Sequence, residues 1–136
     1  MNIKDLIELL GWITVISFSV AILNFVVKYI NKKYISKLGE DKKQIVTFYR
    51  KIMKLIIKCH KAAGTITVIS VLAHFGIAVS SNRISITGII AALIMISIFA
   101  LGFYGAFINK NYKGKWLKVH KVLALLLIIA IGIHVL

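Results

Sequence analysis

The sequence predicts an all-α protein, a four-helix transmembrane bundle whose helices run up, down, up and down. Hydrophobic residues make up 60% of the 136 residues and the mean hydropathy is +0.91, values too high for a soluble protein of this size. The apolar residues form four uncharged runs, at 9–27, 62–79, 84–108 and 122–136. Lysine and arginine gather in two of the segments between these runs, which is typical of a membrane protein.

Each apolar run is the centre of one expected helix. A helix rises about 1.5 Å per residue and a hydrocarbon core is about 30 Å thick, and three of the runs are long enough to cross it. The fourth has only 15 residues, but Trp116 and Leu117 precede it, and Lys118 and Lys121 can extend to the interface. We expect one integral membrane domain, residues 1–136, with helices at about 6–29, 42–80, 85–109 and 115–136.

The first helix is expected to remain in the membrane and not to be cleaved as a signal peptide. Its short N-terminal region contains Asp5 and Glu8 beside Lys4, and no small-residue cleavage site follows the apolar run. A basic segment comes next, which also argues for a retained helix with its N-terminus outside.

The second helix is expected to begin, after a turn at 39–41, with an amphipathic segment that runs along or below the cytoplasmic surface. Lysines occupy one face of this segment. Apolar residues recur on the other face every three to four positions, at Ile45, Phe48/Tyr49, Ile52 and Ile56. The helix then enters the membrane near His60 and ends near 80–82. A second cytoplasmic turn is expected at 111–114.

The formal net charge of +14 is distributed as a topology signal and not as a nucleic-acid-binding surface. Eleven of the 18 Lys and Arg lie between Lys28 and Lys61, and five lie between Lys110 and Lys121. By the positive-inside rule these two segments are cytoplasmic, so both termini and the short loop near 81–85 face outward. We expect an integral protein of the cytoplasmic membrane of a prokaryote, in contact with membrane lipid and not with nucleic acid.

Cys59 is the only cysteine. The chain therefore has no internal disulfide and no Cys-x-x-Cys-His motif for covalent haem attachment. Two interpretations of Cys59 stay open: a small buried residue, or a thiolate that binds a metal or senses redox state.

The four histidines form two pairs with the same spacing. His60 and His74 are fourteen residues apart, as are His120 and His134, and each pair opens with Lys-x-His-Lys. Fourteen residues fall about 40° short of four helical turns, so both members of a pair lie on one face, about 21 Å apart along the axis. The second and fourth helices both run outward from the cytoplasm. His60 is therefore expected level with His120, and His74 level with His134.

This arrangement favours two b-type haems. Ionisable residues inside a membrane are costly and are usually functional. An imidazole on either side of a bundle core suits an iron porphyrin, a flat ring that takes one axial ligand on each face. We expect the four histidines to be iron ligands between the second and fourth helices. Hydrogen-bonded interior histidines are one alternative, and zinc or copper sites are another, although histidines about 21 Å apart cannot share one ion.

Two further sets of residues are candidates for contact with these cofactors. Gly88 and Gly102 are also fourteen residues apart and could make room beside the outer and the cytoplasmic-side haem, although close helix packing explains them equally well. Gly11 has Phe25 at the matching offset, so the first helix does not repeat the pattern. The second set is the cations that could pair with haem propionates: Lys58, Lys61, Lys118 and Lys121 at the cytoplasmic-side haem, and Arg83 at the outer one. Snorkelling to the membrane surface is their alternative role.

With these residues the chain resembles the di-haem cytochrome b superfamily, which includes the N-terminal bundle of cytochrome b, cytochrome b561-like proteins and ferric-reductase-like membrane subunits. The resemblance rests on the four histidines, with Gly88 and Gly102 in the place of the family's spacing glycines, and covers nearly the whole chain. It implies two haems between the second and fourth helices. The sequence has no Pro-Glu-Trp-Tyr quinol-site motif, no later helices and no flavin or nicotinamide domain. The resemblance therefore implies a minimal membrane di-haem subunit.

The expected function is electron transfer across the membrane through two stacked bis-histidine haems, alone or as the membrane subunit of an oxidoreductase. We expect a redox partner protein or subunit, and an acidic electron carrier could dock on the basic loops. Two alternatives stay open. One is a quinone or ferric reductase with its own substrate site. The other is a haem or metal transporter or a structural membrane protein.

Overall fold

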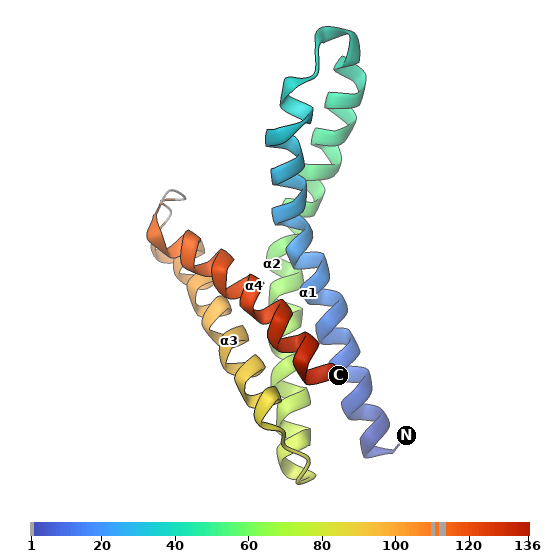
Figure 1. Cartoon of the computed structure of the whole chain (residues 1–136), viewed down its shortest axis with the longest axis vertical. Helices are drawn as coiled ribbons and strands as arrows, with labels where there is room; N and C mark the ends of the chain where they lie inside the picture. The colour runs from blue at the N-terminus through green and yellow to red at the C-terminus, as the bar shows by residue number, and fades with distance from the viewer. Residues whose placement is uncertain (1, 110, 112–113) are drawn as a thin grey trace. The chain divides into compact units, whose positions relative to one another are not determined.

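The computed structural model describes residues 2–109, 111 and 114–136, and the regular structure of these residues is helical throughout (Figure 1). Helix α1 spans Ile3–Lys33, α2 spans Lys43–Ser80, α3 spans Ile86–Phe103 and α4 spans Lys115–Val135. Short helical turns lie at Ile35–Lys37, Glu40–Lys42 and Tyr104–Ile108. The expected turn at 111–114 includes Tyr112 and Lys113, which lie outside the described residues.

Four stretches of the described chain are long and apolar enough to cross a membrane. They are Ile3–Lys37, Glu40–Ser80, Ile86–Ile108 and Lys115–Val135. The prediction of an all-α chain with four long apolar helices is confirmed, and this content is consistent with a four-helix bundle. When the helical turn Tyr104–Ile108 is counted with α3, the largest difference from the predicted bounds is at α1, which ends at Lys33 and not near 29. Lysine is a good helix former, so the helix continues after its apolar run has ended.

The connection between α2 and α3 is fixed by a helix-ending motif and a helix cap. Asn82 has a φ of 53°, a left-handed conformation that asparagine tolerates. The N–H of Arg83 donates to the carbonyl of Ala78 at 2.8 Å and that of Asn82 to Val79 at 3.1 Å, the hydrogen bonds of a Schellman motif. Ser85 then caps α3, because its Oγ accepts from the N–H of Gly88 at 3.1 Å.

The chain packs as two compact units. One unit, Ile13–Thr67, is the hairpin of α1 and α2. Its helices are joined by the Tyr49 hydroxyl, which donates to the carbonyl of Val27 at 2.9 Å, and by Thr67 Oγ1, which donates to Ser17 Oγ at 2.9 Å. Thr67 is only 1% exposed. One hydrogen bond therefore joins the two helices in the buried apolar part of the hairpin, and a second joins them in its basic part.

The apolar face predicted for the basic half of α2 is only partly covered. Tyr49 and Ile56 are half-buried, but Ile45, Phe48 and Ile52 are exposed. The seam between two helices is narrower than the apolar arc that these five residues form. Part of the arc is therefore left uncovered within this unit.

The other unit consists of Met1–Trp12 and Val68–Leu136. In it α3 packs along α4 with small and apolar side chains, and Ala91, Ala92, Met95 and Leu127 are buried. Near the end of this helix pair, the Trp116 ring lies directly against the backbone of Gly105. Trp116 Nε1 donates to the carbonyl of Asn111 at 3.0 Å. Gly105 lies in the helical turn that follows α3, and the absence of a side chain there leaves the space that the indole ring of Trp116 occupies.

Gly105→Ala is expected to destabilise this unit, because a Cβ at residue 105 would overlap the six-membered ring of Trp116. Overpacking of this kind costs about 1–3 kcal/mol. The measurement is thermal unfolding of the purified protein in detergent, with Gly64→Ala as the control. Gly64 is helical and has no atom within 4 Å of its would-be Cβ. An equal melting temperature for the two variants would contradict the packing described.

Candidate functional site

Two of the four histidines lie on α2 and are anchored to the backbone of α1. In the unit Ile13–Thr67, His60 Nδ1 lies 2.9 Å from the carbonyl oxygen of Ala21. In the other unit, His74 Nδ1 lies 2.9 Å from the carbonyl oxygen of Ile7. Ile7 and Ala21 are fourteen residues apart, the same spacing as the histidines. Each histidine of α2 therefore meets α1 in the same antiparallel register.

The two histidines of α4 are anchored to α3 and its cap. His120 Nδ1 lies 3.0 Å from the carbonyl oxygen of Ile98. By the same register His134 would meet the carbonyl of Ile84, but Ile84 precedes the start of α3. His134 Nδ1 instead lies 3.2 Å from both Ser85 Oγ and Thr87 Oγ1. Hydroxyl groups replace the carbonyl where the helix has ended.

These contacts fix the chemical form of the rings. A carbonyl oxygen only accepts a hydrogen bond, so Nδ1 of His60, His74 and His120 must carry the proton. The lone pair of a neutral ring of this tautomer then lies on Nε2, the nitrogen through which such a ring would bind a metal. Hydrogen bonding through the other ring nitrogen is the usual support of a metal-bound histidine. All three rings therefore have the protonation pattern of ligands.

His74 and His134 come together in the unit that contains both. Their ring centroids are 6.2 Å apart and the ring planes are nearly perpendicular, at 89°. Both side chains are half-buried. The sequence prediction that these two histidines lie at one level is thus met within this unit. His60 belongs to the unit Ile13–Thr67, and His120 belongs to the other unit.

The spacing of this pair fits an iron held from two sides. Metal–imidazole bonds are about 2.0 Å long, so two rings on opposite faces of one metal would have centroids about 6 Å apart. Each ring can turn about its bond, so perpendicular planes suit two axial ligands. An edge-to-face ring pair without a metal has a similar geometry. The centroid distance of His74 and His134 is thus compatible with a haem between the two rings.

Three of the histidine rings rest against a glycine of the neighbouring helix. A Cβ on Gly11 would lie 3.4 Å from Cε1 of His74, and one on Gly102 would lie 3.4 Å from Cε1 of His120. At Gly88 the distance to Cε1 of His134 would be only 2.9 Å. Gly88 and Gly102 thus stand at the predicted levels, beneath the imidazoles. Gly11 serves His74 in the same way and was not predicted, because Phe25 interrupts the repeat.

A single local motif underlies these contacts. The glycine follows the carbonyl residue by four positions in both Ile7–Gly11 and Ile98–Gly102. Positions four apart are neighbours along one helix face, so the ring lies over the carbonyl and beside the space left by the missing Cβ. Sequence analysis could not find the carbonyl residues, since any residue type supplies a carbonyl. Only the fourteen-residue spacing of Gly88 and Gly102 gave a signal.

A buried side chain lies midway between the two histidines of α2 and of α4. Thr67 stands seven residues after His60 and is 1% exposed, and Leu127 stands seven residues after His120 and is 0% exposed. Met95, midway between Gly88 and Gly102, is 4% exposed. Among the described residues, each of these helices therefore has its most buried side chain halfway between its two site levels.

The predicted cations and the cysteine lie at the surface of the described chain. Lys58, Lys61, Lys118 and Lys121 are exposed at the basic ends of α2 and α4, and Arg83 is exposed between α2 and α3. Cys59 is exposed, so it is not the small buried residue of one interpretation. Among the described residues no three His, Cys, Asp or Glu side chains gather at one point.

No family model, curated protein or solved structure matches this chain.

Proposed function

We propose that this chain transfers electrons across a membrane through two b-type haems, each held between two histidines. The observation that carries the proposal is the pair His74 and His134, whose centroids are 6.2 Å apart. His60 and His120 would hold the second haem, because their spacing from the first pair is the same fourteen residues on both helices. The resemblance to the di-haem cytochrome b superfamily supports the same assignment.

The residues of the chain have defined tasks in this proposal. A haem held by His74 and His134 would supply one-electron chemistry. The backbone carbonyls of Ile7 and Ile98 orient the rings and fix the proton on Nδ1, which keeps Nε2 basic. Thr67 on α2 and Leu127 on α4 are buried within their own units, midway between the two histidines of their helices. The exposed lysines and Arg83 would neutralise the propionates.

The proposed topology follows from the charges. The basic segments at 28–61 and 110–121 face the cytoplasm and the termini face outward. His60 and His120 are then on the cytoplasmic side, and His74 and His134 on the outer side. Haems held at these two positions would carry electrons through the apolar part of the bilayer. The chain acts as an electron-transfer component, alone or as the membrane subunit of an oxidoreductase.

The first experiment is a reduced-minus-oxidised visible spectrum of the detergent-purified protein, with haem counted per chain. We expect two haems per chain and the sharp bands of six-coordinate low-spin b haem. A quinone or ferric reductase would give the same spectrum but would also be reoxidised by the added quinone or ferric chelate. Well-folded protein that stays colourless when haem is supplied during growth would refute the proposal and favour a transporter or structural role.

A further inference from the structure

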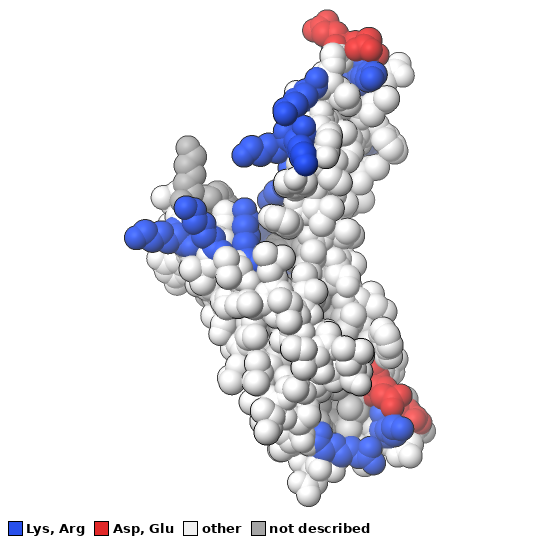
Figure 2. Space-filling model, viewed as in Figure 1, with Lys and Arg blue, Asp and Glu red and all other residues white. Residues whose placement is uncertain are grey.

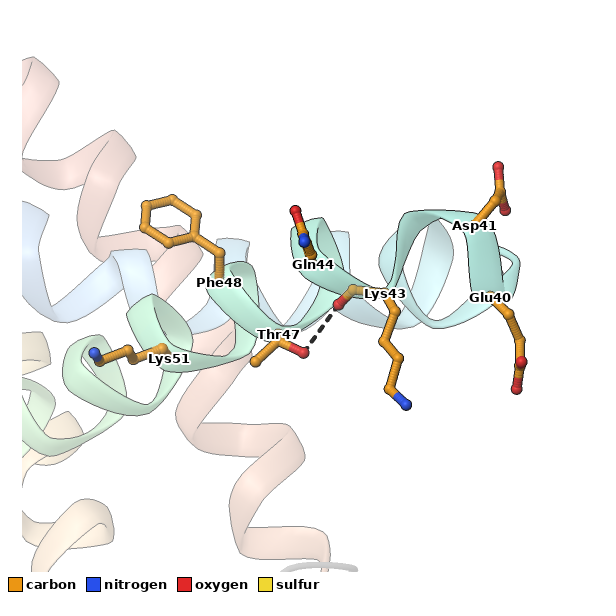
Figure 3. Close-up of a pocket in the computed structure, with 7 residues that line it drawn as sticks. All are labelled: Glu40, Asp41, Lys43, Gln44, Thr47, Phe48 and Lys51. Atoms are coloured by element: carbon orange, nitrogen blue, oxygen red, sulfur yellow. Dashed lines mark hydrogen bonds between the residues drawn. The ribbon is translucent and has the colours of Figure 1, made fainter.

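The basic half of α2 carries a row of exposed apolar side chains that is not used inside the hairpin. Ile45, Phe48, Ile52 and Leu55 are 56%, 67%, 41% and 62% exposed. Their spacing of three, four and three residues places them on one face of the helix. We call these four residues the apolar stripe. Phe48 projects from α2 and is one of the residues that line a shallow hollow near the tip of the hairpin (Figure 3).

A different face of the same segment contacts α1. Val46, Tyr49, Met53 and Ile56 are half-buried, and Tyr49 donates to the carbonyl of Val27. The centre of this second row lies roughly 100° around the helix from the centre of the apolar stripe, at 100° per residue. The contact between α1 and α2 in the unit Ile13–Thr67 therefore does not use the apolar stripe, and the side chains of the stripe stay exposed.

Lipid does not account for the stripe on the proposed topology. The uncharged run of α2 begins at residue 62, and α2 is one continuous helix from Lys43 to Ser80. At 1.5 Å per residue, Phe48 stands about 21 Å and Ile45 about 26 Å beyond the start of that run. The headgroup layer adds only about 5–8 Å to each side of the hydrocarbon core. Most of the stripe is therefore in water, where contiguous apolar surface marks a protein interaction site.

The charge around the stripe selects the chemistry of the partner. Lys51 and Lys58 adjoin one edge of the stripe by helical position, and Lys54 follows them. The segment 28–58 contains ten Lys or Arg and two acidic residues, Glu40 and Asp41. Figure 2 shows the two acidic residues at the tip of the hairpin and basic side chains below them. A second copy of the chain would bring the same positive charge to the contact and be repelled.

We propose that the apolar stripe docks a soluble acidic protein, which presents an apolar patch rimmed by Asp and Glu. The apolar side chains supply the buried contact and the lysines steer the encounter and set its orientation. The inference rests on the sidedness in the proposed function, since the hairpin must face the compartment of the partner. It does not depend on haem, because the site at His74 and His134 is not part of the stripe.

The test is site-specific photo-crosslinking of the full chain in the membrane of the cell that makes it. A photoreactive phenylalanine replaces Phe48 in one variant and Thr47 in the control. Both positions are exposed, but Thr47 lies about 120° from the centre of the stripe. We expect the Phe48 position to capture one acidic soluble protein and the Thr47 position to capture none.

The captured protein is then purified and its binding is measured against the full chain in nanodiscs of neutral lipid. Phe48→Ala and Lys51→Glu are each expected to weaken binding about tenfold, and rising salt weakens it further. Thr47→Ala should leave binding unchanged, and a His74→Ala variant that lacks a haem should still bind. Adducts with lipid, with a second copy or equally from Thr47, no adduct at all, or binding that ignores Phe48→Ala would each overturn the proposal.

Discussion

His74→Ala is expected to remove one haem and leave the other, so that the haem count falls from two per chain to one. His74 supplies one of the two rings whose centroids are 6.2 Å apart, and a haem with a single histidine ligand is no longer six-coordinate and low-spin. The alanine also removes the hydrogen bond to Ile7. The measurements are haem per chain and the reduced-minus-oxidised spectrum of the purified variant.

The matched variants make this prediction specific for a shared site. His134→Ala should remove the same haem as His74→Ala, and the double variant should lose no more than either single one, because residues that act as a unit are not additive. His60→Ala should remove the other haem and leave the spectrum of the first intact. Additive losses from His74 and His134, or unchanged low-spin bands in His74→Ala, would contradict the assignment of both rings to one iron.

Gly88→Ala is expected to disturb the same haem without removing a ligand. Its Cβ would stand 2.9 Å from Cε1 of His134 and 2.9 Å from Oγ of Ser85, closer than carbon atoms pack, so the ring or its hydroxyl partner must move. We expect loss or broadening of the bands of that haem and a destabilisation of about 1–3 kcal/mol. Visible spectra and thermal unfolding in detergent measure the two effects.

Two other glycines provide graded controls for Gly88. At Gly102 the Cβ would lie 3.4 Å from Cε1 of His120, an ordinary contact, so Gly102→Ala should have a smaller effect and act on the other haem. Gly132 lies two residues from His134 but has nothing within 4 Å of its would-be Cβ. Gly132→Ala should leave both haems unchanged, and can add up to about 1 kcal/mol of helix stability. Equal effects at all three positions would show that contact with the rings is not the cause.

The positions of the four helices could be predicted from the lengths of the apolar runs and from the charged and turn residues at their ends. Apolar length predicted four helices, and the bounds of α2 and α4 were right to within one residue, because charged and turn residues stand directly at their ends. The end of α1 was less predictable, since Lys28, Lys32 and Lys33 favour helix on the basis of propensity while ending the apolar run. A membrane span and its helix need not end at the same residue.

The candidate site was only partly predictable for a different reason. Histidine and glycine are rare enough that a fourteen-residue spacing stands out, which identified the rings and two of the three glycines beside them. Their hydrogen-bond acceptors are backbone carbonyls, which have no residue signature. Likewise, the sequence showed that Ile45, Phe48 and Ile52 are apolar but not that α1 would leave all three exposed. Their exposure depends on the rotation of one helix against another.

The four histidines differ in how readily a mutation can remove the hydrogen-bond partner of their Nδ1 atom. Ile7, Ala21 and Ile98 hold their imidazoles through main-chain oxygens, and no substitution of those residues deletes the acceptor. His134 is held by Ser85 and Thr87, whose hydroxyls a single nucleotide change can remove or exchange. Evolution and protein engineering can therefore adjust the environment of one ring by point mutation while the other three keep theirs. Functional divergence among descendants of this chain would be expected to accumulate at that end of α3.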